Sequence, residues 1–112
     1  MAFILAEERK FKATVGIKLP AGLDSFDKQA IVCEYLIIPE SAMNATIKAG
    51  GDKAVLKTIL KSVEGFLDDD GEPLYLDDGL INAICDRTYL LEPIIKTYYS
   101  RVRGDEPALK NV

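Results

Sequence analysis

The sequence predicts a single α+β domain in which an N-terminal antiparallel β-hairpin packs against about four α-helices. Three observations favour this class. Apolar and polar residues alternate along residues 11–19, which is the period of a strand with one face in water. After residue 38 the apolar spacing changes to the three-and-four period of helices. No strand–helix–strand unit is apparent, so a parallel doubly wound sheet is not predicted.

The hairpin comes from two β-rich runs. In residues 11–19 one parity is apolar, namely Phe11, Ala13, Val15, Ile17 and Leu19. Pro20 and Gly22 stop this run. The second run, residues 31–38, is apolar on both faces apart from Glu34, which predicts a strand covered at least in part on both sides. The polar residues between the runs predict a long hairpin loop. Phe26 in that loop is a candidate exposed aromatic, but packing over the hairpin end is favoured.

Two helices are expected directly after the hairpin. The first begins at Pro39-Glu40 and ends at Gly50-Gly51, because proline and an acid mark helix starts and glycine marks a helix end. Asp52 can cap the second helix, which ends at Gly65. The apolar stripe of this second helix is Val55, Leu56, Ile59, Leu60 and Val63.

Two further helices follow an acidic segment. Asp77-Asp78 can cap a short third helix over residues 80–85. The last helix extends from Thr88 to Arg103 and contains Pro93, so it either begins late or bends at that residue. Gly104 ends it. We therefore expect residues 1–104 to form the domain and residues 105–112 to form a mobile polar tail.

Composition limits the chemistry. The chain has 112 residues, of which 14 are basic and 18 acidic, and it has no histidine, the commonest general base and metal ligand. Cys33 and Cys85 form no Cys-x-x-Cys pair, and we expect free thiols in a cytoplasmic protein. No apolar run approaches the roughly 18 residues of a membrane helix. The sequence predicts no enzyme, no metal or cofactor site and no membrane partner.

The segment from Phe66 to Leu76 is an acidic turn. Asp70-Gly71 is typical of a tight turn between two short apolar pieces. A calcium loop with Gly71 at its sixth position would place Phe66 at the first ligand position, where Asp or Asn is needed. We therefore interpret the segment as a solvated turn rather than a calcium site.

Two groups of side chains are candidates for partner binding. Lys53, Lys57 and Lys61 recur every four residues and would line one edge of the second helix. They form either an ordinary solvated face or the rim of a protein-binding surface. The tyrosines and basic residues of the last helix would suit nucleic acid. However, the chain is acidic and Tyr98 lies on the apolar stripe, so core packing is favoured and no nucleic-acid partner is predicted.

Residues 63–78 contain a pattern that resembles the small tail assembly chaperones of long-tailed bacteriophages. In that family two strands lead into helices, a Gly-aromatic step ends a helix, and an Asp-Gly-Glu-Pro-Leu turn precedes two last helices. The matching features are Gly65-Phe66, the turn at 70–74, and the helices at 80–85 and 93–103. The resemblance covers residues 10–103, with Phe66 where tryptophan is more usual.

The resemblance implies a non-catalytic function. Family members bind the tape measure protein before and during polymerisation of the tail tube, act in the host cell cytoplasm without a cofactor, and are absent from the mature virion. The expected partner is the tape measure protein, with the tail tube protein as a further candidate. Two other classes stay open: a small phage or bacterial protein-binding adaptor, and a structural head-tail component.

Self-association and a longer form are two further expectations. A two-stranded sheet leaves exposed edges, and several copies would hold a long partner by avidity, so a homo-oligomer is expected. The resemblance also implies a longer product made by ribosomal frameshifting. Leu109-Lys110-Asn111 is encoded by a slippery heptamer if the codons read A-AAA-AAC or A-AAA-AAT. The nucleotide sequence decides between such a site and a chance tripeptide.

Overall fold

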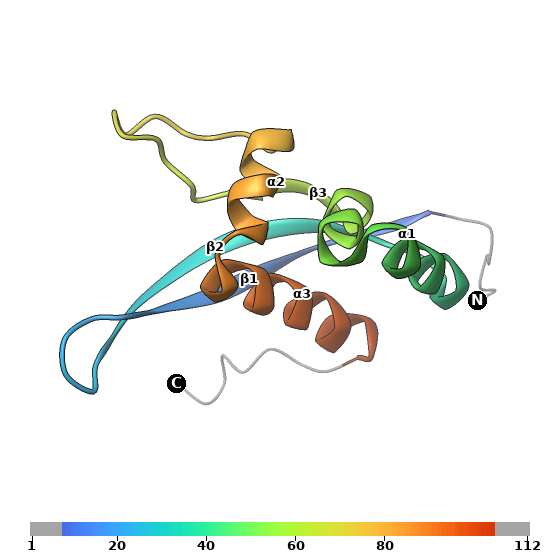
Figure 1. Cartoon of the computed structure of the whole chain (residues 1–112), viewed down its shortest axis with the longest axis horizontal. Helices are drawn as coiled ribbons and strands as arrows, with labels where there is room; N and C mark the ends of the chain where they lie inside the picture. Colours follow the sequence, from blue (N-terminus) through green and yellow to red (C-terminus); the bar gives the residue numbers. More distant parts are fainter. Residues whose placement is uncertain (1–7, 105–112) are drawn as a thin grey trace, which may run out of the picture.

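A computed structural model describes residues 8–104 of the chain. Its strands are β1 (Arg9–Pro20), β2 (Phe26–Ile37) and β3 (Leu60–Glu64), and its helices are α1 (Glu40–Ile59), α2 (Asp78–Cys85) and α3 (Thr88–Val102). The three strands form one antiparallel sheet in the order β1-β2-β3 (Figure 1). The predicted α+β class is confirmed.

The hairpin is longer, and its loop shorter, than the sequence predicts. β1 and β2 pair without interruption from Arg9 opposite Ile37 to Pro20 opposite Phe26, so only residues 21–25 form the loop. The polar residues at the start of β2 join the ladder because strand pairing uses backbone groups and does not require apolar side chains. At the loop, the Ala21 N–H donates a hydrogen bond of 3.0 Å to the Ser25 carbonyl oxygen.

A third strand takes the place of an expected helix end. The sequence predicts helix as far as Gly65, but Leu60–Glu64 pairs with β2, with Val63 opposite Cys33. The Gly65-Phe66 step therefore follows a strand and not a helix. Gly65 has a φ of 112°, and a Cβ there would lie 3.1 Å from Ile31 Cγ2. Only glycine fits this exit from the sheet without strain.

The prediction of about four helices is wrong, because the described residues form three. Gly51 has non-helical backbone angles, φ 63° and ψ −148°, which produce a kink inside α1. The expected break at Gly50-Gly51 is therefore a change of direction within one element. The residues after Gly51 are helical again, so no connecting loop separates the two halves of α1.

The last two helices follow the sequence closely. The Leu80 N–H donates a 2.8 Å hydrogen bond to Asp77 Oδ1, so the predicted cap of α2 is confirmed. α3 begins at Thr88 and continues through Pro93. The alternative in which this helix begins late is therefore wrong.

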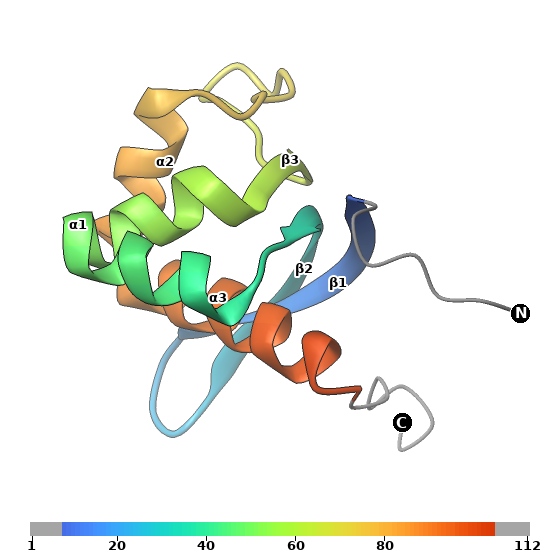
Figure 2. The same ribbon diagram turned by 90° about the vertical axis from the view of Figure 1, so that its right-hand side faces the viewer.

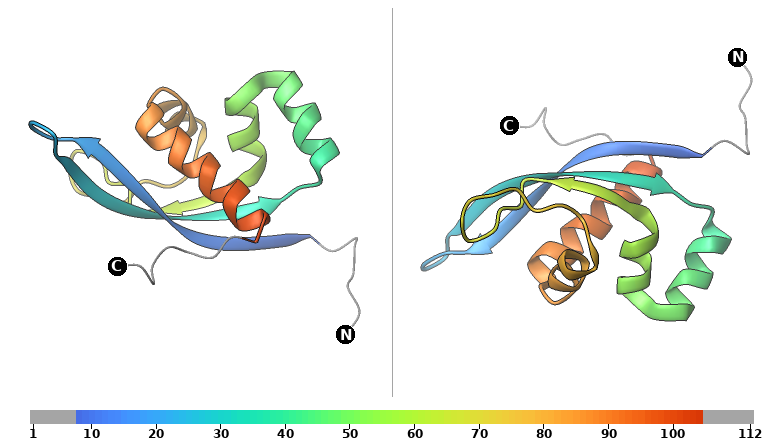
Figure 3. Two further views of the ribbon diagram at one scale, coloured as in Figure 1. Left: turned by 90° about the horizontal axis from the view of Figure 1, so that it is seen from below. Right: turned by 90° about the horizontal axis from the view of Figure 1, so that it is seen from above.

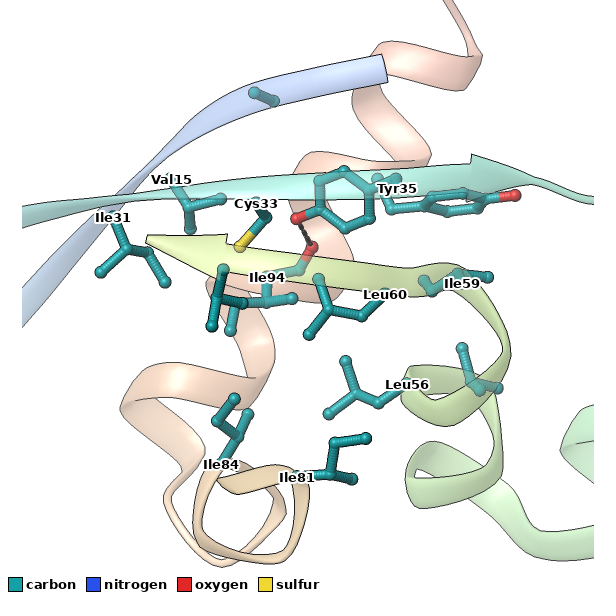
Figure 4. Close-up of a cluster of buried hydrophobic side chains, with 14 of the residues drawn as sticks. Val15, Ile31, Cys33, Tyr35, Leu56, Ile59, Leu60, Ile81, Ile84 and Ile94 are labelled. Atoms are coloured by element: carbon teal, nitrogen blue, oxygen red, sulfur yellow. Dashed lines mark hydrogen bonds between the residues drawn. The ribbon is translucent and has the colours of Figure 1, made fainter. Parts of the chain in front are cut away.

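All three helices cover the same face of the sheet (Figure 2, Figure 3). The core lies between that face and the helices, where Val15, Cys33 and Leu56 are fully buried (Figure 4). No element of residues 8–104 covers the opposite face, where Val32, Glu34 and Leu36 are half-buried. The expected cover on both sides of β2 is therefore only partial.

Some predictions fall on residues outside the described range. These are the polar tail 105–112 and, within it, the frameshift tripeptide Leu109-Lys110-Asn111. Among residues 8–104, no helix combines the length and the apolar character needed to cross a membrane.

Candidate functional site

The three predicted partner-binding lysines are exposed but do not share one helix. Lys53 and Lys57 lie in the second half of α1, whereas Lys61 lies in β3. Lys57 Nζ is 3.7 Å from Asp78 Oδ1 at the start of α2. A charged pair this exposed adds little stability. The three lysines therefore do not form the continuous edge of one helix, and their role in binding stays a prediction.

An aromatic cluster fixes α3 against the sheet. Phe11 of β1 stacks on Tyr35 of β2 with ring centroids 5.0 Å apart, and Tyr35 lies 5.6 Å from Tyr98 of α3. The Tyr35 hydroxyl donates a 2.7 Å hydrogen bond to the Ile94 carbonyl oxygen (Figure 4). The Tyr98 hydroxyl accepts one of 3.1 Å from the Ile38 N–H. The expected core packing of Tyr98 is confirmed, and these contacts position the surfaces on both ends of α3.

One surface, which we name the helix-end cleft, lies where the end of α3 meets the start of α1. It has a volume of about 420 Å³ and is lined by Ile38, Glu40, Met43, Tyr98, Tyr99, Val102 and Arg103. Tyr99 and Val102 are exposed. Ile47 is also exposed and follows Met43 by one turn of α1, so it extends the same stripe. Apolar side chains from two helices therefore line an open groove.

A second surface, the hairpin cleft, lies between the far end of the hairpin and the start of α3. It has a volume of about 670 Å³ and its walls are mainly apolar. Phe26 of β2 and Tyr89 of α3 both line it and are exposed. Lys18, Lys28 and Lys96 also line it, with Glu92 as the single acid. The cleft thus combines aromatic walls with an excess of positive charge.

The acidic loop, residues 66–76, projects beyond the core and forms a small turn. The Asp68 carboxylate accepts hydrogen bonds of 2.9 Å from the N–H groups of Asp70 and Glu72. Leu67 and Pro73 form an isolated antiparallel bridge below that turn. Within residues 8–104, no three Asp, Glu or Cys side chains converge in a group able to hold a metal ion. The carboxylate of Asp68 therefore has a structural role in shaping the turn.

Neither cysteine is arranged as a nucleophile. Both are free thiols, as predicted, with Cys33 fully buried and Cys85 half-buried. Burial raises the pKa of Cys33 to about 12, and it also raises the pKa of Cys85. Because the thiolate is the reactive form, both thiols are poorly reactive at neutral pH. Burial therefore disfavours a nucleophilic role for either cysteine.

Sequence reasoning missed both clefts. Phe26 is exposed, whereas the sequence favours its packing over the hairpin end, and its proximity to Tyr89 depends on how the twisted hairpin passes α3. One local signal exists: Lys18 and Lys28 are opposed in the β1–β2 ladder, and like charges opposed across strands are unfavourable. The opposition of these two lysines can be recognised only when the hairpin register is known.

Comparison with known proteins does not place the chain in a family. No protein-family model matches it, and neither the curated proteins nor the solved structures contain a significant match.

Proposed function

We propose that this chain is a tail assembly chaperone of long-tailed bacteriophages. It binds the tape measure protein in the host cell cytoplasm while the tail tube polymerises, it needs no cofactor or nucleic acid, and it leaves before the virion is complete. Two lines of reasoning support the proposal: the sequence resemblance over residues 10–103 and an open apolar groove between helices.

The helix-end cleft is the observation that carries the proposal. A long helical partner presents apolar side chains at every third or fourth residue, and a groove between two helices receives such a stripe. Tyr99 and Val102 are exposed in its lining, and Ile47 is exposed one turn beyond Met43 on α1. Exposed apolar side chains gathered around a groove are typical of a protein-binding surface.

The lysines add long-range attraction rather than the main contact. Lys53 and Lys57 lie on α1 beyond the kink at Gly51, and none of the three lysines lines the helix-end cleft. Charges on the margin of an interface mainly affect the association rate and its salt dependence. We therefore assign binding strength to the apolar side chains and steering to Lys53, Lys57 and Lys61.

Co-purification with the tape measure protein of the same phage tests the assignment. The double variant Ile47→Asp/Val102→Asp places one charge in the lining of the groove and a second one turn beyond Met43 on α1, and we expect it to lose the tape measure protein. Both side chains are exposed, so the fold should persist, which circular dichroism checks.

Leu23→Asp is the matched control, because Leu23 is 92% exposed in the hairpin loop, away from the helix-end cleft. Equal recovery of the tape measure protein by wild type and by the double variant would rule out this groove. Failure of the wild-type chain to recover it would rule out the function itself.

A further inference from the structure

The hairpin cleft has a charge excess that residues 8–104 do not neutralise. Lys18, Lys28 and Lys96 line it against Glu92 alone, and no ion pair within the described residues involves these three lysines. Lys18 and Lys28 occupy opposed ladder positions, an arrangement that is unfavourable by itself. An acidic group bound over the pair would remove that repulsion.

The apolar part of the cleft indicates what else its occupant must carry. Phe26 and Tyr89 present exposed rings from opposite walls. Aromatic side chains in a pocket are the usual anchors of protein interfaces. The occupant should therefore combine acidic groups with apolar or aromatic side chains on a short segment.

The acidic loop of this same chain has that chemistry. It carries Asp68, Asp69, Asp70 and Glu72 and no basic residue. Leu67 and Tyr75, on either side of the acids, are 62% and 78% exposed. The two hydrogen bonds to Asp68 Oδ1 and the Leu67–Pro73 bridge hold the turn in shape, so little conformational entropy is lost when it docks.

The loop and the cleft of one molecule lie apart. In Figure 1 the loop (yellow) lies at the upper left and the hairpin end (blue) at the lower left, and in Figure 2 they lie at the top and the bottom of the molecule. No residue of the loop lines the hairpin cleft of its own molecule, so we consider a contact between the loop of one molecule and the cleft of another. Such a contact joins two different surfaces, which builds a reciprocal dimer, a ring or a longer array.

We propose that the acidic loop of one copy docks in the hairpin cleft of a second copy. Asp69, Asp70 and Glu72 lie against Lys18, Lys28 and Lys96, while Leu67 and Tyr75 enter the groove beside Phe26 and Tyr89. This self-association goes beyond the proposed function, because it uses neither the helix-end cleft nor the tape measure protein. It also differs from pairing of sheet edges, since no backbone ladder is extended.

Two charge-reversal variants test the proposal by sedimentation velocity. The cleft variant is Lys28→Glu/Lys96→Glu. The loop variant is Asp69→Lys/Asp70→Lys, which keeps Asp68 to shape the turn. Between about 10 µM and about 1 mM the wild type should associate, and each variant alone should associate at least about tenfold more weakly.

Mixing gives the sharper result. The cleft variant keeps an intact loop and the loop variant keeps an intact cleft, so an equimolar mixture should form a one-to-one complex. A chain that carries all four substitutions should regain self-association, because its charges are complementary again. Raising the salt concentration should weaken every one of these complexes.

Lys10→Glu/Lys48→Glu is the matched control, because it changes the net charge equally at exposed lysines outside the cleft. It should associate like the wild type. A monomeric wild type, single variants that associate normally, or a mixture without a complex would each overturn the proposal. None of these results depends on whether the chain binds a tape measure protein.

Discussion

Two buried tyrosines connect α3 to the sheet through their rings and their hydroxyls. Tyr35 and Tyr98 are almost fully buried, and both hydroxyls have backbone partners. Burying a hydroxyl is costly unless it is hydrogen-bonded. Because Ile94 and Ile38 supply those partners, the two tyrosines fix where α3 lies and so shape the clefts at both of its ends.

Tyr35→Phe should destabilise the fold. The substitution keeps the ring but leaves the buried Ile94 carbonyl without the 2.7 Å hydrogen bond from Tyr35. We expect the free energy of unfolding to fall by about 1–3 kcal/mol in chemical denaturation. Tyr75→Phe, at a ring that is 78% exposed, should change it little. Equal stability of both variants and the wild type would show that the hydroxyl of Tyr35 is dispensable.

The thiol of Cys33 should make the fold less stable in alkali. Burial raises its pKa to about 12 from an ordinary value of 9.0, so between these values the unfolded chain loses a proton that the folded chain keeps. Stability attributable to this group is full below pH 9 and falls as pH rises, by at most about 1.4 kcal/mol per pH unit. Burial raises the pKa of Tyr35 too, with the same sign.

Denaturation at pH 8 and pH 10 measures this effect, with Cys33→Val as the comparison. The valine variant should lose less stability than the wild type between the two pH values. Equal losses would mean that ionisation of Cys33 does not contribute.

At the scale of elements, local signals predicted the hairpin, the start of α1 at Pro39-Glu40 and the cap of α2, but not the third strand. The alternation in residues 11–19 and the cap at Asp77 depend on neighbours in sequence, so they could be recognised. Leu60–Glu64 forms a strand because β2 offers it an unpaired edge, and such a tertiary contact overrides helix propensity. The kink at Gly51 likewise depends on packing, since a Gly-Gly pair is compatible with either a helix end or a bend.

Asp77→Ala should weaken α2. The carboxylate accepts the Leu80 N–H at 2.8 Å, and loss of such an N-cap costs about 1 kcal/mol. The measurement is again the free energy of unfolding in denaturant. Asp78→Ala is the control, because it removes an acid one position later whose ion pair with Lys57 is exposed and worth less. A larger effect at Asp78 than at Asp77 would contradict this account of the helix start.

At the scale of the whole molecule, neither cleft was predicted, and none of the three predicted lysines lines either one. The sequence indicated that binding would use helices and basic side chains, and Lys53, Lys57 and Lys61 were chosen by their spacing. The clefts could not be predicted, because each joins residues far apart in the chain, such as Phe26 with Tyr89 and Met43 with Val102. Such pairs meet only once α3 is packed against the hairpin and α1.

The central claim is that the chain accompanies the tape measure protein during assembly and then departs. Quantitative mass spectrometry of purified tail assembly intermediates and of mature virions tests it most directly. We expect the chain in intermediates that contain the tape measure protein, and its absence from virions. Its absence from those intermediates, or its retention in virions in a fixed ratio to tail proteins, would contradict the claim, and retention would identify a structural component instead.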